Sequence, residues 1–203
     1  MEYICDCGER KFVAPNAAKY PCLACECYAF IEEATNIDEE TFAGLLLRAG
    51  RNHGPALLYA AHSSGVIDDE VIGRHVGSIW SGVEFPDRTL EWDEWMEFFE
   101  IAGYRVDGTG ATLPTEPIRL YRAAASAHVY GHSWTDDLAV AQHFLAVGYR
   151  DTFKPSLWTA EVEPERLLAY IADDRPGESH YVIDTTGLEV VEVSPEYHEA
   201  RND

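Results

Sequence analysis

Positive charge is scarce in this sequence. Its 203 residues include 15 Lys and Arg against 36 Asp and Glu, so the formal net charge is −21 at pH 7. A chain with this balance repels phosphate backbones and anionic lipid headgroups. We therefore expect neither non-specific nucleic-acid binding nor a polybasic membrane anchor, although a small local nucleic-acid site stays open.

Long hydrophobic runs are also missing. No stretch approaches the roughly 18 apolar residues of a membrane span, and the N-terminal sequence MEYICDCGERK lacks the apolar centre of a signal peptide. Hydrophobic residues still make up 46% of the chain, which excludes wholesale disorder. The sequence thus predicts a cytoplasmic protein of one or two domains with no membrane partner.

Cysteine is absent after Cys27. All five cysteines lie between Cys5 and Cys27, and an odd, crowded set does not suit a disulfide framework. The pairs Cys5-x-Cys7 and Cys22-x-x-Cys25 are separated by 14 residues and have the spacing of a tetrahedral zinc site. Four thiolates leave no open position on the metal, so we predict a structural, turn-rich, zinc-ribbon-like module over residues 1–34. Cys27 could replace Cys25 as fourth ligand or stay outside the site, and five buried thiols without metal are the alternative.

Residues 35–112 are predicted to form a helical segment. Apolar residues at three- and four-residue spacing, with capping and stop signals, indicate helices at 36–50, at 55–65, from 68 onward, and at 92–103. Four Gly or Pro residues between 104 and 117 indicate a linker.

The pattern changes in residues 113–203. Ile118 to Arg122 has the character of a strand, and Thr135 is a good cap for a helix that ends at Gly148. Short strands are predicted at 157–162, 168–171, 181–184 and 188–193. Several short strands around few helices indicate an α+β fold.

Three motifs in this region carry a family resemblance. They are Arg119-Leu120-Tyr121-Arg122, then Gly131-His132-Ser133-Trp134-Thr135 with its following helix, and finally the segment Arg175 to Asp184, which contains Glu178. In this order they resemble the ADP-ribosyltransferase fold of the arginine–serine–glutamate type, especially its small bacterial and phage members. The resemblance covers roughly residues 115–194 and implies a split β-sheet fold that uses NAD as substrate.

The resemblance also implies roles for individual residues. Arg122 matches the arginine that holds the NAD pyrophosphate, and an arginine fork suits that group. Ser133 and Thr135 match the hydroxyl triplet of the nicotinamide-ribose pocket, while Glu178 is the candidate catalytic carboxylate. Tyr121 and Phe144 are candidates for stacking on nicotinamide or walling the pocket, and His180 is a candidate for contact with the ribose.

The sequence departs from the family at the glutamate-x-glutamate motif, which here reads Glu178-Ser179-His180. If the second glutamate is the catalytic one, His180 has replaced it, and a neutral or positive imidazole stabilises an oxocarbenium ion poorly. If the loop shifts by two residues, Glu178 serves. Each site residue also has a simpler interpretation. Arg122 could be an ordinary strand-end arginine, Ser133 and Thr135 a helix start, and Phe144 a core residue.

Three function classes therefore stay open. The first is a mono-ADP-ribosyltransferase acting on a protein or nucleic-acid acceptor. The second is a module of the same fold that binds NAD or ADP-ribose without turnover. The third is an acidic interaction protein, such as an inhibitor or mimic, whose negative surface is the functional feature.

Overall fold

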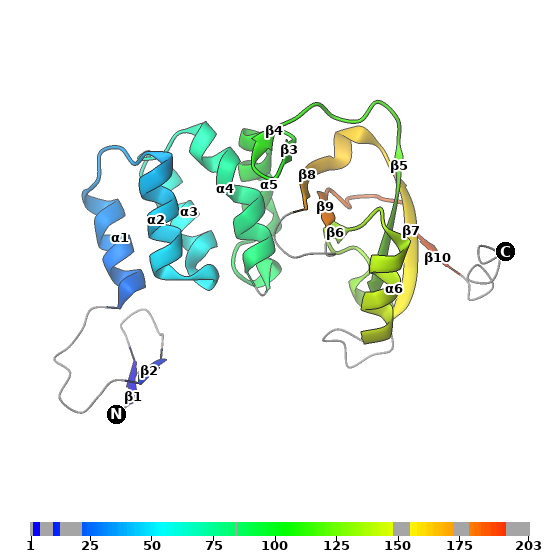
Figure 1. Cartoon of the computed structure of the whole chain (residues 1–203), viewed down its shortest axis with the longest axis horizontal. Coiled ribbons are helices and arrows are strands. Elements are labelled where there is room, and N and C mark those ends of the chain that lie inside the picture. The colour runs from blue at the N-terminus through cyan, green and yellow to red at the C-terminus, as the bar shows by residue number, and fades with distance from the viewer. Residues whose placement is uncertain are drawn as a thin grey trace.

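The computed structural model describes residues 2–4, 10–12, 22–83, 85–147, 155–172 and 179–193. Helices α1 to α5 lie at one end of the molecule and two β-sheets at the other (Figure 1). The α+β class expected from the sequence is confirmed. No helix in these segments is long and apolar enough to cross a membrane.

The helical half consists of α1 (Leu23–Glu33), α2 (Glu39–Ala49), α3 (Gly54–Ser63), α4 (Asp69–Gly82) and α5 (Trp92–Ala102). The four helices expected between residues 36 and 103 are all present. Capping residues set their starts: the Asp38 carboxylate accepts a hydrogen bond from the Thr41 amide, and Asp68 does the same for Val71, both at 2.9 Å. Helix α2 therefore starts after Asp38, later than the predicted start at residue 36. Short 3₁₀ turns cover Arg51–His53, Pro86–Arg88, Ser126–His128 and Pro164–Arg166.

The N-terminal region differs from the expected turn-rich module over residues 1–34. Strands β1 (Glu2–Ile4) and β2 (Arg10–Phe12) form an antiparallel pair, but residues 23–33 form α1, which packs on α2 and α3. Cys27 and Ile31, both 1% exposed, lie in the core of the helical half. The helical segment therefore begins at Leu23, because an apolar stripe in this short segment is buried by its helical neighbours.

Five strands form the first sheet of the C-terminal half, in the order β4 (Thr109–Gly110), β3 (Arg105–Val106), β8 (Leu167–Ile171), β9 (His180–Ile183) and β6 (Ser133–Trp134). Strands β3 and β8 are parallel, and the other neighbours are antiparallel. The predicted linker at 104–117 is thus wrong in its first half. Its Asp107-Gly108 turn, with φ of 47° and 75°, closes the β3–β4 hairpin.

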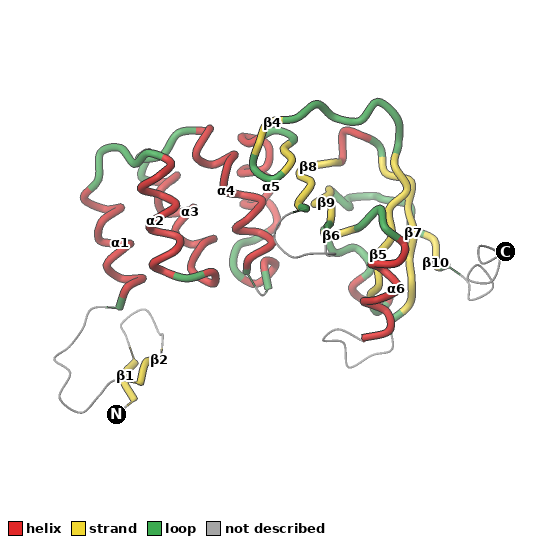
Figure 2. Tube along the Cα trace, in the orientation of Figure 1, coloured by secondary structure: helices red, strands yellow, loops and turns green. Residues whose placement is uncertain are grey.

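The second sheet has three antiparallel strands in the order β10 (Val191–Glu192), β7 (Ser156–Val162) and β5 (Ile118–Ala124). It meets the first sheet where Tyr121 of β5 and Thr135, just after β6, exchange two backbone hydrogen bonds of 2.7 and 3.0 Å. Figure 2 shows the two groups of strands side by side, with α6 (Leu138–Val147) against β5 and β7.

The helical half and the first sheet share one hydrophobic core. Trp80 of α4 and Trp95 of α5 belong to the same buried cluster as Ala169 and Ile171 of β8 and Val182 of β9. A second cluster fills the space between the sheets; its buried members include Leu120, Trp134, Val162, Leu167 and Ile183. The helices and the first sheet are therefore joined through apolar packing and not through a linker alone.

Candidate functional site

Arg122 and Ser133 are brought together by the junction of the two sheets. The Nη1 of Arg122 donates a 2.6 Å hydrogen bond to the carbonyl oxygen of Ser133, and its Nε donates a longer one, 3.4 Å, to the carbonyl of His128. Alternation along β5 puts Arg122 on the same face as the buried Leu120. The guanidinium therefore lies against the loop that leads into β6.

Gly131 permits this close approach. A methyl group built on Gly131 would overlap the guanidinium, with its carbon 2.7 Å from Cζ of Arg122. Three further hydrogen bonds hold the surrounding loop. The Trp134 indole donates to the Gly131 carbonyl at 2.7 Å. From the segment at β9, the Thr185 hydroxyl donates to the Tyr130 carbonyl at 2.7 Å, and the Ile183 amide donates to the His132 carbonyl at 2.9 Å. The Gly131-to-Thr135 motif is thus a fixed segment between β5 and β9.

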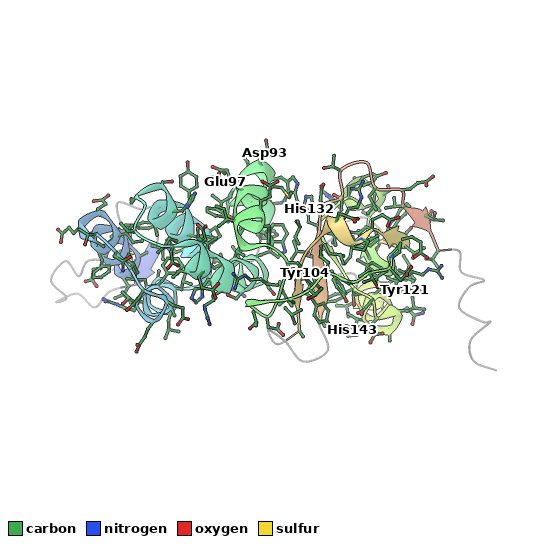
Figure 3. All side chains as sticks on the ribbon, turned by 90° about the horizontal axis from the view of Figure 1, so that it is seen from above. Asp93, Glu97, Tyr104, Tyr121, His132 and His143 are labelled. Atoms are coloured by element: carbon green, nitrogen blue, oxygen red, sulfur yellow. The ribbon has the colours of Figure 1, made fainter. Side chains whose placement is uncertain are left out.

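Two tryptophans of the helical half reach the same motif. The indole N–H of Trp80, on α4, donates to the Ser133 hydroxyl at 3.2 Å. The ring of His132 stacks on Trp92 of α5, with centroids 3.3 Å apart and planes 8° apart. Seen from above, His132 lies on the side of the sheets that faces α5 (Figure 3).

The neighbours of His132 fix its tautomer. Its Nδ1 lies 3.1 Å from the Ile183 carbonyl oxygen, which accepts only, and 3.4 Å from the Thr185 hydroxyl oxygen, whose own proton goes to Tyr130. Nδ1 therefore carries the proton, and in the neutral imidazole the lone pair is on Nε2.

Tyr121 and Phe144 do not lie beside Arg122. Tyr121 is 7% exposed and packs with Ala141 of α6 and Leu157 of β7, on the face of β5 opposite Arg122. Phe144 is carried by α6, which covers that same outer face. In Figure 3 Tyr121 lies farther than His132 from the end of the molecule formed by helices α1 to α5. The expectation that these two aromatics wall the arginine's pocket does not fit this placement, since odd and even positions of β5 point to opposite sides.

Thr135 lies two residues after Ser133 in the motif and is 5% exposed. Its backbone joins the two sheets, and its hydroxyl accepts from the Asp137 amide at 3.1 Å. Asp137, and not Thr135, accepts from the first turn of α6, through the Ala139 amide at 2.8 Å. Thr135 thus joins the two sheets. The prediction that Thr135 caps α6 is wrong, because Asp137 takes that role.

His180 is the first residue of β9 and pairs with Ile171 of β8, while β9 pairs with β6 on its other side. The strand that follows the Glu178-x-His180 motif therefore lies directly beside the strand that carries Ser133. Glu178 itself lies outside the described residues.

A tyrosine cluster flanks this sheet. The rings of Tyr170 on β8 and Tyr181 on β9 lie 4.5 Å apart, and the Tyr181 hydroxyl is hydrogen bonded to the Asp136 carboxylate. Burial, together with the Asp136 charge, raises the pKa of Tyr181 far above its usual range, and burial also raises the pKa of Tyr104. Both phenols therefore stay protonated at neutral pH. The motifs recognised in the sequence assign no role to Asp136.

The N-terminal cysteines are described only in part. Cys22 directly precedes α1 at its N-cap position and is 2% exposed, and Cys25 follows it by one helical turn. Cys27 is buried, and its thiol donates to the Leu45 carbonyl at 3.6 Å; burial raises the pKa of this thiol. No group of three or more metal-binding side chains occurs within the described ranges, and Cys5 and Cys7 lie outside them.

Comparisons with protein-family models, with curated proteins and with solved structures found no significant match for this chain.

Proposed function

We propose that this chain is a nucleotide-using transferase whose site lies at the junction of the two sheets. More particularly, we propose a mono-ADP-ribosyltransferase that takes NAD as substrate and modifies a protein or nucleic-acid acceptor. The observation that carries the proposal is the 2.6 Å hydrogen bond from Arg122 to the Ser133 carbonyl. It joins the first two motifs of the resemblance, whose bonded residues are 11 positions apart. Strand β9, which holds the described end of the third motif, pairs with β6 at this point.

The reaction breaks the bond between nicotinamide and ribose, and its electron pair leaves with nicotinamide. The acceptor nucleophile then forms a bond to the anomeric carbon and releases its proton. In this scheme Arg122 contacts the pyrophosphate, Ser133 donates to the nicotinamide-ribose half, and Glu178 stabilises the developing positive charge. The protonated Tyr181, bonded to Asp136, adds a fixed polar edge to the same sheet.

The first test is release of nicotinamide from NAD, followed by mass spectrometry of the acceptor species. Arg122→Ala is compared with Arg119→Ala as a matched control. Arg119 lies on the outer face of β5, where its Nε donates to Glu161 at 2.7 Å and both side chains are more than half exposed. We expect Arg122→Ala to weaken NAD affinity about tenfold to a hundredfold and Arg119→Ala to leave it unchanged. Equal effects of the two substitutions would contradict the proposal.

His180 supports the second candidate, a module that binds NAD or ADP-ribose without turnover. Strand β9 starts with a histidine where the family motif has glutamate. Of the two motif positions, only Glu178 can then supply the negative charge that stabilises the positively charged transition state. Glu178→Gln should abolish nicotinamide release while sparing NAD binding, since a group used in the transition state affects turnover more than affinity. If the wild type binds NAD without cleaving it and His180→Glu creates activity, the binding module is correct. If the wild-type protein binds no NAD, the remaining hypothesis is the acidic interaction protein.

We also propose a structural zinc ion bound by Cys5, Cys7, Cys22 and Cys25. The position of Cys22 and Cys25 one turn apart at the start of α1 supports it, because thiols at this spacing reach one metal ion. The neutral, hydrogen-bonded thiol of Cys27 supports its exclusion from the ligand set.

A further inference from the structure

The helical half contributes a side chain to the candidate site. Trp80, near the end of α4, is 53 residues before Ser133 in sequence, yet its indole nitrogen lies 3.2 Å from the Ser133 hydroxyl oxygen. The side chain is almost fully buried, with a relative exposure of 4%. The backbone of Ser133 is held in β6, where it pairs with Val182 of β9.

The chemistry of this pair fixes the direction of the hydrogen bond. An indole N–H only donates, so the Ser133 oxygen must accept. A hydroxyl has one proton and two lone pairs, and the bond from Trp80 uses a lone pair. The Ser133 proton is therefore directed away from Trp80, towards an acceptor atom elsewhere.

The indole is held in place by other aromatic rings. Its centroid lies 5.1 Å from Trp95, 5.8 Å from Trp92 and 6.1 Å from His132, all in edge-to-face contacts. Edge-to-face packing of this kind favours a single ring orientation. Trp80 thus presents its N–H from a rigid support, and this lowers the cost of orienting Ser133 when a ligand binds.

We propose that Trp80 is a positioning residue for the transfer reaction. It holds the Ser133 hydroxyl as a hydrogen-bond donor towards an oxygen acceptor in the nicotinamide-ribose half of NAD. The inference depends on the proposed function, and it assigns the five-helix half a direct role in the site. Without the indole N–H, the serine hydroxyl can rotate and is shared between donating and accepting arrangements.

The test compares Trp80→Phe with Trp95→Phe. Both substitutions keep an aromatic ring in the same core, and both remove one indole hydrogen bond, since the Trp95 indole donates to the Pro86 carbonyl at 3.1 Å. Their effects on thermal stability should be similar. We expect Trp80→Phe to lower kcat/KM for nicotinamide release about tenfold, which corresponds to the loss of one hydrogen bond. Trp95→Phe keeps an aromatic ring against the Trp80 indole and should leave kcat/KM within about twofold of wild type.

A double-mutant cycle separates positioning from general structural damage. In a Ser133→Ala background, Trp80→Phe should have no further effect on kcat/KM, because the hydroxyl it orients is gone. In parallel, the indole N–H resonance of Trp80 in NAD-free protein should shift on Ser133→Ala, and that of Trp95 should not.

The outcomes distinguish the two hypotheses. Additive effects in the cycle, or equal losses for the two tryptophan variants, would overturn the role of Trp80 and leave the transferase proposal standing. A wild-type protein with neither NAD binding nor nicotinamide release would overturn both, even if the resonance shift confirmed the hydrogen bond.

Discussion

The imidazole of His132 lies flat on the indole of Trp92, with ring centroids 3.3 Å apart. The stack joins α5 to the segment between β5 and β6, so the helical half contacts the Arg–Ser motifs through Trp92 as well as through Trp80. Because Nδ1 of His132 also faces the Ile183 carbonyl, the ring is held from two sides. The position of the Gly131-to-Thr135 motif therefore depends on residues that precede it by about forty to fifty positions in the sequence.

Truncating Trp92 should destabilise the protein. Trp92→Ala removes the stack on His132 and an edge contact with Trp80. Because Trp92 is only partly buried, we expect a loss of about 2 kcal/mol in the free energy of unfolding, less than for a fully buried aromatic. Denaturant unfolding measures it. Trp92→Phe should recover much of the loss, and Leu47→Ala, at a site 87% exposed, should have little effect. If Trp92→Ala left the free energy of unfolding unchanged, the stack on His132 would contribute nothing to stability.

Adding one methyl group at Gly131 should disturb the candidate site. Gly131→Ala places a carbon against the Arg122 guanidinium, which must move away from the Ser133 carbonyl. We expect weaker NAD binding, measured by calorimetric titration, and only a small change in stability, because the clashing atoms are the end of a flexible arginine side chain.

Gly44→Ala is the matched control for this prediction. Gly44 lies in the middle of α2, and a methyl group there meets no atom within 4 Å. This substitution should stabilise the protein by up to about 1 kcal/mol and leave ligand binding unchanged. The interpretation of Arg122 would be wrong if Gly131→Ala proved as harmless as Gly44→Ala.

The zinc proposal predicts different results for neighbouring cysteines. Purified protein should contain about one zinc per chain, and Cys22→Ser or Cys25→Ser should lose it. Cys27→Ala should keep the metal, because this buried thiol is neutral and donates to the Leu45 carbonyl. Elemental analysis measures the ratio. Loss of zinc in Cys27→Ala would show that Cys27 is a ligand, and a folded N-terminal segment without zinc would overturn the site.

Stability should fall on mild acidification because of His75. Burial lowers the pKa of His75 below its ordinary value of 6.5; the carboxylate of Glu39, 3.4 Å away, acts in the opposite direction but less strongly. The imidazole therefore binds a proton more readily in the unfolded chain than in the folded one. The free energy of unfolding is highest above about pH 7, and it decreases as the pH falls through 6.5 towards the lower pKa of the folded state.

Denaturant unfolding between pH 7.5 and about pH 5 checks this prediction, since the slope from one histidine reaches at most about 1.4 kcal/mol per pH unit. His75→Phe should give a flatter profile in this window. Some carboxylates have a lowered pKa, such as Glu70, which accepts a hydrogen bond from Arg105. They change the free energy of unfolding only at more acidic pH, and His75→Phe should leave that part of the profile unchanged. An unchanged slope in His75→Phe would rule out His75 as the source.

Local signals in the sequence were enough for most of the secondary structure. The helices between residues 36 and 103 and the strands β5, β7, β8 and β9 follow from apolar periodicity, which is a short-range property of the chain. The order of the Arg122 and Ser133 motifs was also visible, as was the departure at His180. Arg119 and Arg122 lie on opposite faces of β5, as the fixed period of two in a strand requires.

Tertiary structure decided what the sequence left open. Residues 104–110 look like a linker on composition, yet β3 pairs in parallel with β8, more than sixty residues later. Residues 23–33 form a helix because α2 and α3 bury Cys27 and Ile31. The placement of Tyr121 under α6 and of Trp80 against Ser133 depends on contacts between distant segments, which no local pattern encodes. The sequence therefore determined which residues form helices and strands, and long-range packing determined which of them meet at the candidate site.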